Sequence, residues 1–530
     1  MFFTSYEFLV FILVLFLLYY CIPKKFQWML LLVASYIFYF IAGADYLIYI
    51  LVTTITTYFT ARKIEQNANR QKAYIKEHKS ELSQEEKKEY KKKQKSIRLR
   101  WLVACIILNI GILAVVKYAN FAISNVNSIW NAFGGSGQLS FVTLAIPLGI
   151  SFYTFQSLGY LIDIYRGAYS AEKNPFKFAL FVSFFPQLIQ GPISRFGDLS
   201  KTLYQQHSFN SRTVCHGLQR MLWGYFKKMV IADRILTGVS MIIGDTAGYS
   251  GAYIFVGMIF YTVQLYADFT GGIDITIGIA ETMGITVQEN FIRPYFSKSL
   301  KEYWRRWHIS MCNWFRDYLF YPVSTSKVMQ KFSRFSRKRF GTTVGTRMPM
   351  YLSSFLVWFA TGIWHGASWN FIVWGLLNWA VLMISQELEP VYRRFHGRFA
   401  VERKTAYRIF QMARTFLLIC VLNLFDCYET LSETFSMIVS MFTAKNWHIL
   451  WDGSLMALGL STLDYVILAL GVIVLLLVSL WQRSGSVRDK IAQKAYPLRF
   501  CIWYGMFLVV LLMGAYGIGY DSSQFIYNRF

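Results

Sequence analysis

The chain has 530 residues and a formal net charge of +25, with 55% hydrophobic and 16% charged residues. Soluble globular domains contain about 25% charged residues and about 45–50% apolar ones, so this composition excludes a soluble or a disordered protein. The positive charge alone would favour nucleic acid, but the basic residues stand between long apolar runs, and we expect no nucleic-acid partner. The seven cysteines are scattered and form no CxxC pair, so they indicate no secreted disulfide framework.

Apolar runs that approach the length of a bilayer span, about 20 residues, recur along the whole chain. The first, residues 8–22, is interpreted as a retained anchor and not a cleaved signal peptide, because no A-x-A type site follows it. The other runs cover residues 26–41, 46–61, 101–118, 144–165, 350–365, 369–386, 409–425, 463–481 and 500–519. Residues 176–283 are apolar but broken by glycine, proline and charge, which predicts irregular or re-entrant helices. We therefore expect an all-α polytopic membrane protein with about 11 transmembrane helices.

Basic segments between these runs predict the orientation of the chain in the membrane. The positive-inside rule places residues 62–100, 327–347, 393–414 and 483–499 in the cytoplasm and the N-terminus outside. Residues 62–100 form a basic insert with 14 Lys/Arg and 6 acidic residues, expected to be a helical arm. Such an arm would touch anionic lipid headgroups or, alternatively, dock a partner.

His365 lies within an apolar run, where an ionisable side chain is costly and marks a functional site by default. Gly362 and Gly366 flank it at a small-xxx-small spacing that permits close helix approach. Gly366 is also expected to leave open space beside the imidazole ring. A lined cavity is favoured over a packed structural histidine by the aromatic and polar neighbours Trp364, Trp369 and Asn370.

His308 shares a short segment with Arg305 and Arg306, and on a helix Arg305 would be its i−3 neighbour. An interfacial helix with snorkelling arginines explains the tryptophans of this segment. A pocket for an anionic, phosphate-bearing donor explains the cations and the histidine as well, because arginine binds phosphate in bidentate fashion. The sequence has no P-loop, HExxH or GxSxG pattern, and we expect no metal site. Histidines in this setting point to general acid–base chemistry.

Two further polar clusters lie inside apolar sequence. Asp268 and Asp274 stand on either side of a Gly-Gly pair, which predicts a kink beside a polar cavity and pairing with the arginines near His308. Gln190 lies between two prolines, which forbid a continuous helix. Broken backbone at membrane depth is tolerated only inside protein or around a cavity. We expect Asp268, Gln190 and Asn370 to bind substrate.

Taken in chain order, these clusters resemble the membrane-bound O-acyltransferase family (MBOAT), and most closely its bacterial branch of alginate and peptidoglycan O-acetylation membrane proteins. The most specific likenesses are Tyr-Trp-Arg-Arg-Trp-His-Ile-Ser at residues 303–310 and Gly-Ile-Trp-His-Gly at residues 362–366. Further likenesses lie at residues 3–8, 147–153, 190–193 and 289–295. The Gly-Gly-Ile-Asp of residues 271–274 departs from the Gly-Tyr-Ser-Asp-like turn of the family.

The resemblance implies one membrane domain over residues 1–530, a ring of helices around a central funnel and tunnel, in the bacterial plasma membrane. It also implies an enzyme that moves an acyl group, in most of the branch acetyl, from a cytoplasmic thioester to an extracytoplasmic hydroxyl. The donor would be acetyl-CoA or an acyl carrier protein, with no bound cofactor. The acceptor would be a cell-surface polysaccharide or a secreted acetyltransferase partner.

By the same resemblance, His365 matches the presumed catalytic histidine and His308 the second functional one. We expect His365, deep toward the outside, to act as general base. His308, nearer the cytoplasmic side, would position the donor with Arg305 and Arg306, and the reverse assignment of the two histidines stays open.

Three alternatives remain at this stage. A transporter or flippase for a polysaccharide or lipid-linked intermediate would use the same intramembrane charges, but no internal repeat is visible in the sequence. D-alanyl transfer to teichoic acid would keep the enzyme class and change the group. A structural scaffold would leave two histidines in apolar surroundings without a purpose.

Overall fold

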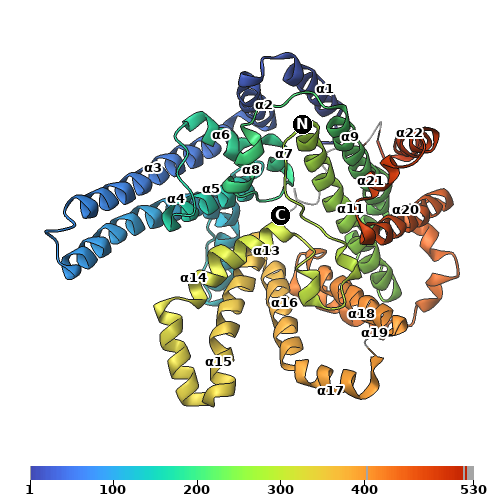
Figure 1. Cartoon of the computed structure of the whole chain (residues 1–530). Helices are drawn as coiled ribbons and strands as arrows, with labels where there is room; N and C mark the ends of the chain where they lie inside the picture. Colours follow the sequence, from blue (N-terminus) through green and yellow to red (C-terminus); the bar gives the residue numbers. More distant parts are fainter. Residues whose placement is uncertain (1, 402–403, 517–519, 522–530) are drawn as a thin grey trace. The chain divides into compact units, whose positions relative to one another are not determined.

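The computed structural model describes residues 2–401, 404–516 and 520–521, and within these ranges its regular elements are all helices (Figure 1). The all-α prediction is therefore confirmed. The chain divides into two compact units, and each is described by itself. Unit 1 comprises Ser5–Val214 and Ala280–Gln288, and unit 2 comprises Phe2–Thr4, Cys215–Ile279 and Glu289–Phe530. The single family-type domain over residues 1–530 stays a prediction.

Unit 1 begins with the helices that the first apolar runs predicted. Its elements are α1 Tyr6–Cys21, α2 Gln27–Ala42, α3 Leu47–Glu77, α4 Gln84–Ala132, α5 Ile150–Arg166, α6 Pro175–Ser183, α7 Phe185–Ile189 and α8 Phe196–Leu203. The run at 144–165 becomes helical only after Gly149, which has a left-handed φ of 68°. A Cβ at Gly149 would lie 2.3 Å from the carbonyl oxygen of Leu188, so both backbone conformation and space require glycine there.

The basic insert at residues 62–100 is a helical hairpin made of the end of α3 and the start of α4, which lie side by side (Figure 1). Ser83 and Glu86 form a reciprocal capping box that starts α4 after the turn. Side-chain amides join the two helices, with Asn67 donating to Gln94 at 2.7 Å and Arg98 donating to Asn67 at 3.0 Å. The predicted helical arm is confirmed, and its cytoplasmic side stays a prediction.

Unit 2 carries the C-terminal part of the fold. Its α-helices are α9 Ser211–Tyr225, α10 Asp233–Gly244, α11 Ala252–Thr282, α12 Leu300–Tyr303, α13 Ile309–Phe315, α14 Tyr321–Ser324, α15 Lys327–His365, α16 Trp369–Glu387, α17 Glu389–Phe399, α18 Thr405–Asn423, α19 Leu431–Thr443, α20 Thr462–Trp481, α21 Val487–Ala492 and α22 Tyr496–Met513. Two π-helical turns, Phe226–Ala232 and Arg316–Phe320, interrupt this series. The first residues of α9 and the last residues of α11 fall in unit 1. α15 turns back on itself at Gly341, whose φ is 75° (Figure 1). Its basic first half and its apolar second half are thus separate helical arms.

Six of the helices in the described part of the chain are long and apolar enough to cross a bilayer, or seven if the bent pair α16 and α17 counts as one span. The six are α2, α4, α11, α18, α20 and α22, with the short flanking turns of α2, α18 and α20 included. The predicted total of about 11 spans is not confirmed, partly because α1 has only 16 residues. These helices nevertheless make the chain a polytopic membrane protein.

The stretch from residue 176 to 283 is irregular at its start, as predicted, with the short helices α6, α7 and α8. Its second half differs from the expectation, because α11 runs without interruption through the Gly-Gly pair. The pair serves packing instead. A Cβ on Gly271 would lie 3.0 Å from the carbonyl oxygen of Gly224, so glycine permits α9 and α11 to approach closely.

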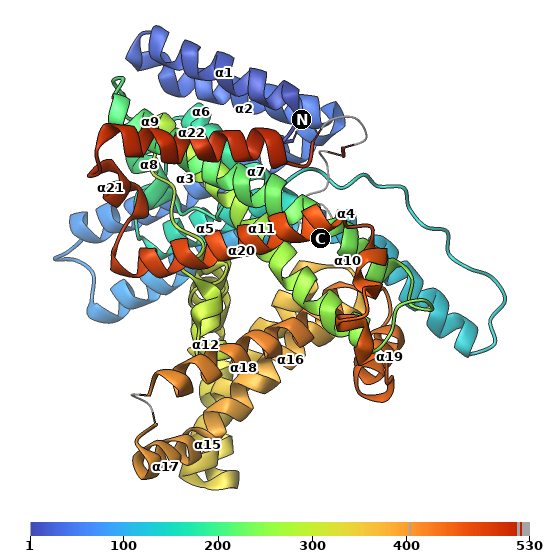
Figure 2. The same cartoon turned by 90° about the vertical axis from the view of Figure 1, so that its right-hand side faces the viewer.

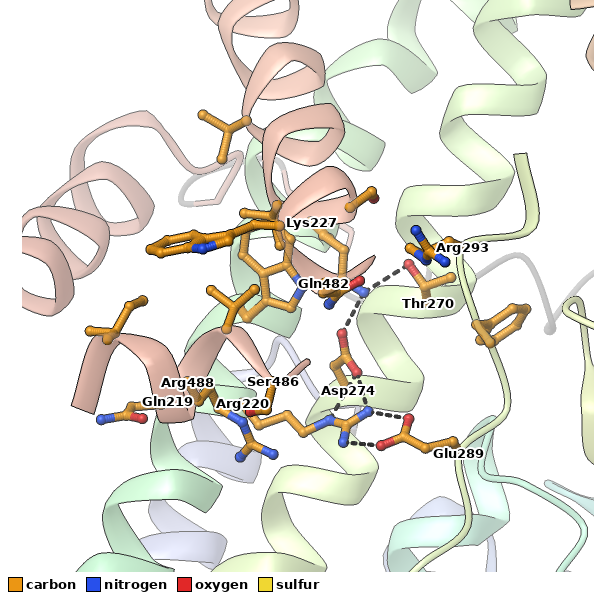
Figure 3. A pocket seen from close by; sticks show the side chains of 18 of the residues that line it. Gln219, Arg220, Lys227, Thr270, Asp274, Glu289, Arg293, Gln482, Ser486 and Arg488 are labelled. Atoms are coloured by element: carbon orange, nitrogen blue, oxygen red, sulfur yellow. Dashed lines mark hydrogen bonds and ion pairs between the residues drawn. The ribbon is translucent and has the colours of Figure 1, made fainter. Parts of the chain in front are cut away.

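Around the π-helical turn Phe226–Ala232, unit 2 has one of its hydrophobic cores. Val230 and Ile231 are buried there against Leu468 and Leu475 of α20 and against Val510 of α22. Figure 2 shows that α20 and α22 run in opposite directions and that α21 joins them at one end. Residues of α20, α21 and α22 line a pocket of about 590 Å³, together with Arg220, Lys227 and Asp274 (Figure 3).

Candidate active site

His365 is the last residue of α15, and α16 begins four residues later. The two helices approach closely because a Cβ on Gly362 would lie 2.5 Å from the carbonyl oxygen of Phe371. The imidazole of His365 lies among aromatic rings, with centroids 5.0 Å from Trp364 and 4.6 Å from Trp374. The predicted close helix approach is present, and of the predicted aromatic neighbours Trp364 contacts the ring. Trp374, which the sequence pattern did not single out, is the second, whereas Trp369 is largely exposed.

The open space expected at Gly366 is absent. A Cβ at Gly366 would lie 2.1 Å from the ring of Phe371, and that ring stacks 6.4 Å from His365. Glycine is needed there because an aromatic ring fills the position that a side chain would take.

His308 does not lie inside a helix as the sequence pattern predicted. α12 ends at Tyr303, and His308 has a left-handed backbone, with φ 47° and ψ 52°, immediately before α13. The predicted placement of Arg305 beside His308 on one helical face is therefore wrong. The reversal turns the His308 side chain inward, where it is only 1% exposed. Its ring makes an edge contact with Phe269 of α11 at a centroid distance of 4.9 Å.

Asn290 holds this segment and was not singled out from the sequence. Its side-chain amide lies 3.3–3.4 Å from Nδ1 of His308. Its Oδ1 accepts the backbone N–H of Ser310 at 2.9 Å, and its carbonyl oxygen accepts that of Ile309 at 3.0 Å. Asn290 thus satisfies the first two N–H groups of α13, which His308 does not cap.

Trp364 brings the two histidines together. Its ring lies 5.9 Å from that of His308 and 5.0 Å from that of His365, between ring centroids. Burial lowers the pKa of His308, which lies outside the candidate spans, well below its usual value, and the nearby His365 lowers it further. His308 is therefore a neutral ring at neutral pH. Both histidines thus belong to one site, and the depth of each in the bilayer stays a prediction.

The two arginines of the segment have different surroundings. Arg306 pairs with Glu302 at 2.5 Å and also donates to the carbonyl oxygen of Arg293 at 3.4 Å. Arg305 is exposed, whereas His308 is buried. Their role as donor-binding residues stays a prediction.

Asp268 is fully buried and pairs with Lys228 at 2.6 Å, and Lys228 pairs in turn with Asp233 at 2.6 Å. The predicted pairing of this acidic cluster with the arginines near His308 is wrong for both aspartates, since Asp274 pairs with Arg220 and Lys227. A signal for this was present in the sequence. Two lysines in the apolar run that precedes α11 need carboxylate partners at the same depth.

Gln190 and Asn370 are both buried polar residues, in unit 1 and unit 2 respectively. Gln190 follows α7 in a non-helical stretch, as predicted, and its amide has no hydrogen-bond partner in the described part of the chain. Asn370 donates to the carbonyl oxygen of Tyr428 at 2.5 Å and to Thr434 at 3.1 Å, tying the start of α16 to α19 and to the segment that precedes it. Substrate binding by either residue stays a prediction.

Fold and site together define a polytopic, all-helical membrane protein in which two histidines share one aromatic surround. No group of three or more metal-ligating residues that could hold a metal ion occurs among the described positions. The sequence profile of "MBOAT, membrane-bound O-acyltransferase family" matches residues 170–337. A probable alginate O-acetylase AlgI of Azotobacter vinelandii is 33% identical over 479 residues, which cover 88% of this chain and 84% of the relative. The chain therefore belongs to the membrane-bound O-acyltransferase family, and it is a membrane-embedded O-acyltransferase.

Two other relatives show how far the similarity extends. A peptidoglycan O-acetyltransferase of Helicobacter pylori is 28% identical, over 69% of this chain and 66% of the relative. A teichoic acid D-alanyltransferase of Bacillus subtilis is 29% identical, over 44% of this chain and 58% of the relative. The similarity to the acetylating relatives thus covers a larger share of the chain.

Proposed function

We propose that the chain transfers an acetyl group from a cytoplasmic thioester donor to a hydroxyl of an extracytoplasmic cell-surface polysaccharide, directly or through a relay partner. The observation that carries this proposal is the meeting of His308 and His365 at Trp364 in a member of an O-acyltransferase family. The names of the alginate and peptidoglycan relatives, both of which denote O-acetylation of a polysaccharide, support acetyl as the group and a polysaccharide as the acceptor.

In the proposed reaction His365 is the general base. It removes the proton from the acceptor hydroxyl while the hydroxyl oxygen attacks the carbonyl carbon of the thioester. A C–O bond forms, the C–S bond breaks, and the departing thiolate takes up the proton that His365 held. General base catalysis of this kind contributes typically about 10²–10⁴-fold to a rate.

His308 has a different task in this proposal, because its neutral ring cannot supply a positive charge. Held at Nδ1 by Asn290, its ring is fixed in orientation and donates a hydrogen bond from Nε2–H to the carbonyl oxygen of the thioester. Arg305, which is exposed, is the better candidate of the two arginines for a phosphate-bearing donor such as acetyl-CoA or an acyl carrier protein. Arg306, with its partner Glu302, would hold the segment in place.

Inverted membrane vesicles test the proposal. Acetyl-CoA labelled in the acetyl group is supplied to the cytoplasmic face, and label is measured on the polysaccharide enclosed in the lumen. We expect label with the wild type, a loss of at least 100-fold with His365→Ala, and normal membrane insertion of that variant. Undiminished transfer by an inserted His365→Ala variant would refute the assignment. Passage of an unmodified polysaccharide without label would favour a transporter.

D-alanyl transfer is the second candidate, favoured by the similarity to the teichoic acid D-alanyltransferase. A parallel assay with D-alanine carried on its acyl carrier protein separates the two. Transfer of D-alanine in preference to acetyl would replace the acetyl group in the proposal and leave the enzyme class unchanged.

A further inference from the structure

The first half of α15, residues 327–340, is a basic helix to which the proposed acyl transfer gives no task, and it is called the α15 arm below. It holds six cations, and from residue 318 to residue 386 the chain has no aspartate or glutamate. None of the six forms an ion pair with a described residue, and the nearest ion pair along α15 joins Arg347 to Glu387 at 2.5 Å. The described part of the protein therefore leaves the charge of the α15 arm unbalanced.

The α15 arm packs against the second half of α15 along one narrow side. Met329 and Ser336 are the buried residues of the arm, and they lie seven residues, or about two helical turns, apart. A Cβ on Gly345 would lie 2.5 Å from the Cα of Arg337, so the two halves approach closely after the turn at Gly341. This packing determines which sides of the arm face outward.

The outward surface of the α15 arm has a cationic side and an apolar side. Lys331, Arg334 and Lys338 are exposed and recur at intervals of three and four residues, which places them on one side of the helix. Val328 and Phe335, which are 76% and 60% exposed, lie seven residues apart on a neighbouring side. Cations on one side of a helix with exposed aromatic and aliphatic side chains beside them are typical of a helix that lies in the interface of a bilayer.

The basic hairpin of α3 and α4 has a different composition. In residues 62–100 six acidic residues accompany the 14 cations, and interspersed charges of both signs are typical of a helix surrounded by water. The α15 arm has no acidic residue and adds the exposed ring of Phe335. This difference favours a partner for the α15 arm that is both anionic and partly apolar.

The ion pair of Arg347 with Glu387 connects the turn of α15 to the end of the apolar helix α16. There the chain bends by 51° into α17, which repeats the composition of the α15 arm. Phe395 of α17 is exposed, and so are Arg394 and Arg398. Figure 1 shows the turn of α15 and α17 at the same end of the α15–α16 pair. Two basic helices with exposed aromatic rings thus lie where one bilayer surface reaches both.

We propose that the α15 arm lies in the headgroup layer of the cytoplasmic leaflet, where its cations bind the phosphates of anionic phospholipids and Phe335 reaches toward the acyl chains. The positive-inside rule places this basic segment on the cytoplasmic side, and anionic lipids there attract clusters of about 4–8 Lys/Arg. A soluble acidic protein would satisfy the cations, but it would have to cover the exposed apolar side chains of both α15 and α17. Lipid bound in this way holds the helix whose last residue is His365.

Photo-crosslinking of the full-length protein tests the proposal without any turnover, so its outcome is independent of the proposed acetyl transfer. Phe335→benzoylphenylalanine puts a photoreactive ring on the apolar side of the arm, and Gln330→benzoylphenylalanine puts it on the polar side. Each variant is irradiated in nanodiscs of phosphatidylcholine alone, or of equal phosphatidylglycerol and phosphatidylcholine, and lipid adducts on the arm are quantified by mass spectrometry. In the mixed nanodiscs we expect at least fivefold more adduct at position 335 than at position 330, and at least fivefold more at position 335 than in phosphatidylcholine alone.

The dependence on charge has a matched control. Lys331→Gln/Arg334→Gln/Lys338→Gln, combined with the photoreactive ring at position 335, should reduce the adduct in mixed nanodiscs at least fivefold. Removal of three exposed cations from the hairpin of α3 and α4 should leave the adduct unchanged, and this control is Lys72→Gln/Lys76→Gln/Lys88→Gln. Equal adducts in the two lipid compositions, at the two positions, or with and without the three arm cations would overturn the proposal.

A second measurement covers the case in which the triple variant of the arm does not insert. Phe335→benzoylphenylalanine alone is irradiated in native membranes, where soluble and membrane proteins compete with lipid for the arm. A lipid adduct as the main product supports the proposal. A crosslink to another protein as the main product would overturn it and assign the arm to a protein partner.

Discussion

Replacement of Lys228 by methionine is the sharpest test of how unit 2 tolerates charge in its interior. The Nζ of Lys228 lies 2.6 Å from both Asp268 and Asp233, and the three side chains are 0–3% exposed. Lys228→Met leaves two carboxylates facing each other without their cation. Removal of one partner from a buried ionic cluster typically costs about 3–5 kcal/mol. We expect a loss of that size in the free energy of unfolding.

The matched rescue is the triple variant Lys228→Met/Asp233→Asn/Asp268→Asn, which removes all three charges and keeps similar volumes. Replacement of a whole buried ionic cluster by neutral groups is often close to neutral, so most of the lost stability should return. Tyr520 donates to Asp233 at 2.8 Å, and an asparagine there still offers an acceptor.

Equilibrium unfolding in mixed micelles with increasing denaturing detergent measures these differences. Lys494→Met, at an exposed position, serves as control and should fall within about 0.5 kcal/mol of the wild type. The reasoning is refuted if Lys228→Met is within 1 kcal/mol of the wild type, or if the triple variant is as unstable as the single one.

Three further predictions concern the histidine site. Asn290→Ala leaves the buried N–H of Ser310 without its acceptor, which costs about 1–3 kcal/mol. If this cost falls on the transition state, kcat should drop about 5–150-fold with little change in KM. Asn290→Asp keeps the acceptor and should lose less activity, and equal losses in the two variants would contradict the role of Asn290. Gly362→Ala pushes α15 away from α16 and should reduce the rate of acetyl transfer at least tenfold. Gly505→Ala, at a position with open space around it, should leave that rate unchanged. Because the pKa of His308 is lowered, its ring should stay neutral at pH 6, a pH at which an ordinary histidine with a pKa of about 6.5 is mostly protonated. Nitrogen NMR measures this, and a His308 ring that titrates near pH 6.5 would contradict the prediction.

The helices were largely predictable because apolar run length is a property of the local sequence. Residues 26–41 and 463–481 match α2 and α20 within about one residue at either end. The long α11 was missed, since a Gly-Gly pair indicates a break only when no neighbouring helix needs the space. Gly224 on α9 approaches closely enough to need it, and that approach is set by packing between residues almost 50 positions apart.

The histidines were predictable from their type and surroundings, but their local geometry was not. An ionisable side chain in apolar sequence stands out by composition. The reversal at His308, however, depends on Asn290 accepting the N–H groups of Ile309 and Ser310, which are distant in the chain. The arginines were assigned to the same pocket because a helix was assumed. Once the helix is broken, the sequence neighbour Arg305 is exposed while His308 is buried.

Lys227 and Lys228 explain why one charged segment serves two different sites. They are consecutive in a π-helical turn and therefore point in different directions, and π-helical turns recur at functional positions. Their partners Asp274 and Asp268 are six residues apart on α11, which separates them by about 120° around a helix of 3.6 residues per turn. Each lysine thus meets its own aspartate: Lys228 in a closed core and Lys227 in the lining of the pocket of Figure 3. Loss of Lys228 should therefore lower the stability of the core, whereas loss of Lys227 should remove a positive charge from the lining of the pocket.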